Sequence, residues 1–78
     1  MLEIRTDTGD TYIVMGERVL KNGHRLKYLD CPTVLWVGSC SRDGSKMSRT
    51  VTLKRHLCIR FRSGLYVGGV VKQIREAG

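Results

Sequence analysis

The chain has 78 residues, of which 41% are hydrophobic and 27% charged, and its formal net charge is +7. This length allows one small domain spanning 1–78, and the balance of apolar and charged residues excludes a disordered chain. The longest apolar stretches, VLWV and LYVGGVV, fall far short of the ~20 residues that a membrane-spanning helix needs.

Short strands joined by a turn are predicted for the start of the chain. Residues 2–6 alternate apolar with polar side chains, which is typical of a half-buried strand. DTGD at 7–10 supplies the Asp and Gly residues of a tight turn. TYIV at 11–14 then predicts a second strand.

Two hairpins are predicted from their loop residues. Asn22-Gly23 lies between two short apolar runs and is the strongest short-range signal for a two-residue hairpin loop. Ser63-Gly64 predicts the second loop, in a register that places Phe61 opposite Tyr66 as an aromatic cross-strand pair.

The middle of the chain carries the remaining strand signals. TVLWV at 33–37 predicts a buried strand, and 38–45 predicts a loop rich in Gly and Ser. From 47 to 62 apolar and polar side chains alternate without a slip, yet sixteen residues in one strand would span ~50 Å. We therefore expect this strand to bend or break near 54–56, as strands do in small barrels.

These elements predict an all-β domain of about six short antiparallel strands. They would form a small barrel or a rolled sheet of the size of SH3 or OB domains. KQIREAG at the end of the chain is the one stretch compatible with a short helical turn. A domain this small buries a modest core, which makes a homodimer compatible with its size.

The positive charge is confined to the second half of the chain. Residues 1–39 hold five Lys/Arg and five Asp/Glu, whereas 40–78 hold nine Lys/Arg and two Asp/Glu. Concentrated charge destabilises a fold through self-repulsion, so this asymmetry predicts a polyanionic partner, with nucleic acid first.

Basic side chains of this half are predicted to contact phosphates. Residues on one face of a strand lie ~6.6–7 Å apart, close to the phosphate spacing of an extended single strand. Lys54, Arg60 and Arg62 share the polar face of the long strand and are expected to form one row. The full predicted set is Arg42, Lys46, Arg49, Lys54, Arg55, Arg60 and Arg62. The alternative is that these residues only keep strand edges from aggregating.

Two aromatic residues near this charge are predicted to stack on bases. Tyr66 lies in the most basic hairpin, and Trp36 precedes the basic loop. The alternative for both is core packing, because a small domain with five aromatic residues commonly uses them in its core.

Neither a metal site nor an enzyme is predicted. The candidate ligands Cys31, Cys40, His56 and Cys58 lack the C-x₂₋₄-C spacing of structural zinc sites. His24 and His56, with Glu17 or Asp30, are the candidates for acid–base chemistry, but no glycine-rich phosphate loop accompanies them. No catalytic residue, metal or cofactor is therefore assigned.

Three cysteines, an odd number, argue against a secreted disulfide framework, and MLEIRTDTGD lacks the apolar core of a signal peptide. The sequence thus predicts a cytoplasmic protein with reduced thiols. Its predicted function is a small nucleic-acid-binding module for RNA or DNA, with phosphate contacts that select sequence weakly. The alternative is a protein-interaction or regulatory module, viral or accessory, whose basic face docks on an acidic partner protein.

Overall fold

Residues 1–76, which the computed structural model describes, form an antiparallel sheet of eight strands. The strands are β1 (Leu2–Thr6), β2 (Thr11–Met15), β3 (Arg18–Lys21), β4 (His24–Arg25), β5 (Val34–Cys40), β6 (Met47–Ser48), β7 (His56–Phe61) and β8 (Gly64–Glu76). Their order across the sheet is β4-β3-β2-β1-β8-β7-β5-β6.

The all-β prediction is confirmed, because residues 1–76 contain no helix, and hence none that could cross a membrane. The prediction of about six strands is wrong. The helical turn predicted for KQIREAG is also wrong over 72–76, which belong to β8 and of which 73–76 pair with β1. The last two residues of that stretch lie outside the described part of the chain.

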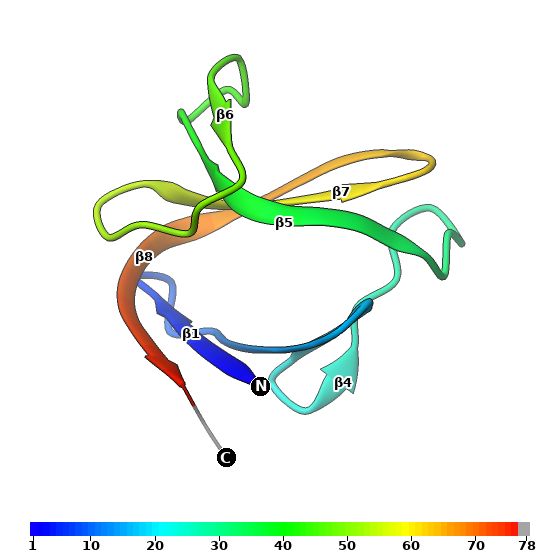
Figure 1. The fold of residues 1–78 in the computed structure, drawn as a ribbon, viewed down its shortest axis with the longest axis horizontal. Helices are drawn as coiled ribbons and strands as arrows, with labels where there is room; N and C mark the ends of the chain where they lie inside the picture. Colours follow the sequence, from blue (N-terminus) through cyan, green and yellow to red (C-terminus); the bar gives the residue numbers. More distant parts are fainter. Residues whose placement is uncertain (77–78) are drawn as a thin grey trace.

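The long strand β8 connects two layers of the sheet (Figure 1). Strands β1 to β4 form one layer, β5 to β7 the other, and β8 curves from the second into the first. The bend lies at Gly68-Gly69, where three steps along β8 match two steps along β7 in a β-bulge. A Cβ on Gly69 would lie 2.7 Å from the Asp7 carboxylate, so a larger residue would force this side chain to move where β8 passes the 7–10 turn.

The core lies between the two layers. It is built from the buried side chains of Ile4, Tyr12, Val19, Cys31, Val34, Leu57, Ile59, Phe61 and Val71. The sheet is rolled around this core but is not closed, because its two edges are the two-residue strands β4 and β6, which do not pair with each other. The closed barrel among the predicted forms is therefore wrong.

The long strand predicted over 47–62 is two strands separated by a loop at 49–55. Lys54 lies in this loop with a φ of 67°, a left-handed conformation outside the range of strands. A break is thus present, but it starts at residue 49, earlier than the expected 54–56, and His56 already belongs to β7. The single row of Lys54, Arg60 and Arg62 is wrong, because Lys54 does not belong to β7.

Both hairpins form, one of them in a different register. Asn22-Gly23 is the two-residue loop between β3 and β4, and both residues have positive φ. In the second hairpin Phe61 pairs with Gly64 and Tyr66 pairs with Ile59, so the loop is at 62–63. The Ser63 hydroxyl donates a hydrogen bond of 2.8 Å to the Tyr28 carbonyl, which fixes this earlier turn against the segment that joins β4 to β5.

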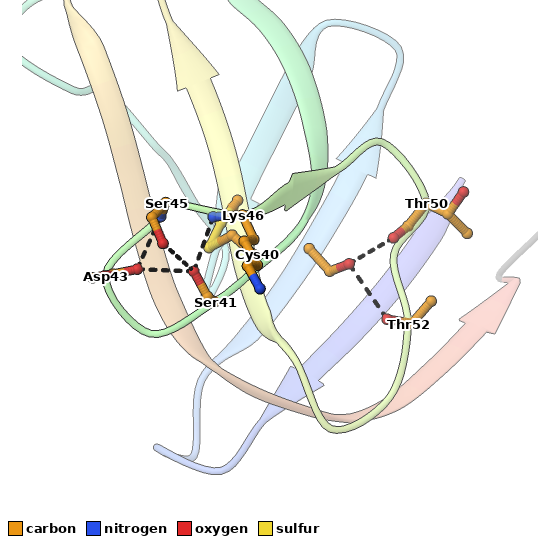
Figure 2. Close-up of a disulfide and its surroundings, with 9 residues drawn as sticks. Cys40, Ser41, Asp43, Ser45, Lys46, Thr50 and Thr52 are labelled. Carbon is orange, nitrogen blue, oxygen red and sulfur yellow. Dashed lines mark hydrogen bonds between the residues drawn. A yellow bond between two sulfur atoms is a disulfide. The ribbon is translucent and has the colours of Figure 1, made fainter.

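A disulfide between Cys40 and Cys58 joins β5 to β7 (Figure 2). The two Cα atoms lie 5.7 Å apart, and both residues are fully buried. The prediction of reduced thiols is wrong for this pair, so reduced thiols no longer support a cytoplasmic location. The bridge joins neighbouring strands whose pairing the sequence does not display, while Cys31 stays a free, buried thiol.

Reduction of the Cys40–Cys58 bridge should lower the free energy of unfolding by about 3 kcal/mol, the expected effect of closing a loop of this length. Urea denaturation with and without reductant would measure the loss. The Cys31→Ser variant should lose the same amount on reduction, because Cys31 lies outside the bridge. Equal urea midpoints in both conditions would contradict the assignment.

Candidate nucleic-acid interface

An open hollow of about 440 Å³ lies on the outer face of β5 and β7, opposite the core. It is lined by Leu35, Trp36, Met47, Arg49 and Arg60, and is called here the Trp36 hollow. Strand β5 supplies the first two residues, β6 and the residue after it the next two, and β7 the last. Apolar and cationic side chains from three parts of the basic half thus meet at one place.

A β-bulge in β5 places two large apolar side chains side by side at the hollow. Val34 pairs with Phe61 and Trp36 pairs with Arg60, so Leu35 is the extra residue. Val34 is buried in the core, whereas Leu35 is 54% exposed. Without the bulge, strict alternation would have turned Leu35 and Trp36 to opposite faces.

The indole ring of Trp36 packs against Gly38. A Cβ at this position would overlap both the Ser48 carbonyl oxygen and the Trp36 ring. The ring therefore lies against the bare backbone of β5 where β6 approaches. Gly38 pairs with Cys58, which forms the disulfide with Cys40. The disulfide therefore links β5 to β7 next to the residue on which the ring packs.

Arg49 and Arg60 are exposed cations at this apolar surface. The ion pairs among residues 1–76 involve Arg5, Lys21, Arg75 and the amino terminus, so neither arginine of the hollow has a carboxylate partner there. Their guanidinium groups are available to an anion from outside the chain.

Arg42 and Lys46 lie on the 41–46 loop, which joins β5 to β6. Figure 2 shows this loop with Ser41, Asp43, Ser45 and Lys46. Asp43 organises the loop by accepting hydrogen bonds from the Ser45 N–H (2.9 Å) and the Ser41 hydroxyl (2.8 Å). These hydrogen bonds lower the pKa of Asp43 to about 2. The loop thus holds its shape through its acidic residue and leaves both cations exposed.

The other predicted cations lie at different places along β7. Arg62 is exposed in the hairpin loop that follows β7. Lys54 and Arg55 precede β7 and hydrogen-bond through their backbone to Val71. The structure therefore brings together Trp36, Arg49 and Arg60, and leaves Lys54 and Arg55 beside β8.

Tyr66 lies on the inner face of the sheet, away from Trp36. Its hydroxyl shares a hydrogen bond of 2.8 Å with that of Tyr12, and its ring contacts Tyr28 edge-on. Burial and this hydrogen bond raise the pKa of Tyr12. Lys21 lies 5.8 Å from the centre of the Tyr66 ring. Because these residues contact both the hydroxyl and the ring of Tyr66, we exclude Tyr66 from the interface.

The residues considered for metal binding and catalysis do not converge on one site. Glu17, His24 and Asp30 are exposed in turns and in β4. Cys40 and Cys58 are bonded to each other, which removes two of the four candidate ligands. Over the described residues, 1–76, no three His, Cys, Asp or Glu side chains are grouped to hold a metal ion.

Sequence reasoning missed Leu35, Gly38 and Met47. Leu35 reaches the hollow because of a bulge, and Met47 because β6 pairs with the end of β5; neither feature is visible in an alternating pattern. The spacing W-x-G could have indicated Gly38, since residues two apart on a strand share a face.

Comparisons of the chain with protein-family models, curated proteins and solved structures found no match. The function of the Trp36 hollow therefore has to be inferred from its own residues.

The Gly38→Ala variant should displace the Trp36 ring, because the added Cβ has no room between that ring and Ser48. We expect a shift of the tryptophan emission maximum and a loss of about 1–3 kcal/mol in unfolding free energy. Gly16→Ala is the matched control, since its Cβ meets open space and its positive φ alone causes strain. The control should be destabilised but keep its tryptophan emission unchanged. Equal spectra for both variants would show that the Trp36 ring does not pack against Gly38.

The Asp43 carboxyl should titrate at about pH 2. Because its pKa in the folded chain is lowered, its support of the loop is complete above the ordinary value and is lost as pH falls through about 2. Carbon-detected NMR of the carboxyl group would give the midpoint. Ser41→Ala should raise it, whereas an ordinary midpoint in the unaltered protein would show that the loop hydrogen bonds do not form.

Proposed function

We propose that this chain is a nucleic-acid-binding module and that the Trp36 hollow is the centre of its contact surface. The observation that carries the proposal is the meeting of an accessible aromatic ring with two arginines that have no carboxylate partner in residues 1–76. The 41–46 loop, which starts and ends on strands that line or border the hollow, adds Arg42 and Lys46.

Phosphate is the anion that this surface suits. A guanidinium group offers a planar fork of donors that matches two phosphate oxygens, and each neutralised phosphate releases condensed counterions. Contacts of this kind position a protein on the backbone without reading bases, so selectivity among sequences should be weak. The excess of seven positive charges also attracts the phosphates electrostatically at long range.

A second candidate is docking on an acidic partner protein. The exposed side chains of Leu35 (54%) and Met47 (47%) favour it, because the centre of a protein interface is apolar and is often rich in Met. Capture from a lysate with and without nuclease separates the two functions. Partners that disappear after nuclease treatment support nucleic acid, and a purified acidic protein that binds the chain directly supports docking.

Arg49→Ala and Arg60→Ala should each weaken binding to every oligonucleotide tested. Each should also flatten the dependence of log affinity on log salt by about 0.7 to 0.9 units, the share of one phosphate contact. Unfolding free energies should change by no more than about 0.5 kcal/mol, as for other surface substitutions. Fluorescence anisotropy of labelled oligonucleotides over a salt series would measure both effects.

Arg18→Ala is the matched control, because Arg18 is an exposed arginine of β3 in the opposite layer. It should leave affinity and salt slope nearly unchanged. If the three variants behave alike, the charge acts without a defined surface, and the Trp36 hollow is not the interface. If the unaltered chain binds no oligonucleotide at low salt, the proposed function is wrong.

A further inference from the structure

We infer that the Trp36 hollow receives an unpaired nucleobase stacked on the indole, so that the ligand is single-stranded nucleic acid and not a duplex. This inference rests on the proposed function and adds the class of ligand. It starts from the composition of the hollow, which is lined by three apolar side chains and two arginines.

Phosphate contacts alone do not explain why three of the residues that line the hollow are apolar. Leu35 and Met47 are about half exposed beside the ring of Trp36, and exposed apolar surface is unfavourable in water. A phosphate cannot cover such a surface, because its charge requires water or hydrogen-bond donors around it. A nucleobase can, since its flat face stacks on aromatic rings whatever its sequence.

The two arginines line the same hollow as the indole, so each can contact the backbone of a nucleotide stacked there. Arg60 is the direct cross-strand partner of Trp36, and the Cβ atoms of such pairs are ~4.5–5.5 Å apart. Arg49 comes from the segment after β6, on another element of the rim. Proteins that bind single strands combine cations that contact the backbone with aromatic rings on which bases stack.

A duplex does not present the matching surface. Its bases are stacked on one another, and a protein meets only base edges in the grooves and phosphates on the outside. Extruding a base would cost a few kcal/mol of stacking and pairing free energy. A single strand exposes its base faces without this cost.

Part of the β5 edge is not paired with any strand of residues 1–76. Strand β6 pairs with β5 only at Ser39 and Cys40, so among the described residues no strand covers the edge from Val34 to Val37. The indole packs against Gly38 in the free chain, and a ring that is already positioned loses less entropy on binding.

Three labelled probes of about ten nucleotides test the inference: a thymidine strand, an abasic strand with the same phosphates, and a duplex that contains the thymidine strand. The thymidine strand should bind at least about fivefold more tightly than the other two. It alone should quench the emission of Trp36, the single tryptophan of the chain.

Trp36→Ala should weaken binding of the thymidine strand by about 5- to 150-fold, the range for one stacked base, and leave binding of the abasic strand unchanged. Trp36→Phe should retain part of the preference. A far-ultraviolet spectrum checks that each variant is folded, and quenching in the unaltered protein tests stacking without any variant.

Each failure has its own signature. If the abasic strand binds as tightly as the thymidine strand and does not depend on Trp36, stacking is refuted while phosphate binding stands. If the duplex binds as tightly as the single strand, the preference for unpaired bases is wrong. If none of the probes binds, the proposed function fails and the inference fails with it.

Discussion

The bend of β8 at Gly68-Gly69 is the constraint on which both layers depend. Strand β8 pairs with β1 in one layer and with β7 in the other. Among residues 1–76 no other strand pairs with both layers. A Cβ on Gly68 would lie 3.2 Å from the Tyr12 hydroxyl, so the Tyr12 side chain of β2 packs directly against the bend. Because the layers meet there, the core between them is formed from residues far apart in sequence.

Local features of the fold were predictable because their causes lie within a few residues. Asn22-Gly23 supplies two positive φ values in succession, and only a tight hairpin uses them. Residues 2–6 alternate because one face of β1 is buried. By contrast, alternation continues through 49–55 although no strand forms there, since Val51 still packs against the core from a loop. Periodicity reports which face is buried, and it does not establish strand pairing.

The candidate site was predictable in its charge and only partly in its geometry. Arg60 and Trp36 were among the predicted contact residues, but their direct pairing depends on the bulge at Leu35. The bridge between Cys40 and Cys58 depends on which strands are neighbours, and an odd number of cysteines pointed the other way. Contacts between distant segments follow from the topology, which a pattern of apolar and polar residues does not specify.

The disulfide makes the segment between its cysteines a covalent ring. Met47, Arg49 and the 41–46 loop all belong to this ring, whereas Trp36 and Arg60 lie just outside it on the two strands it joins. A backbone cut anywhere between the cysteines would leave one molecule, with both new ends tethered beside β5 and β7. The loop is therefore a natural point for proteolytic nicking, lengthening or exchange of residues, because the two halves of the surface cannot diffuse apart.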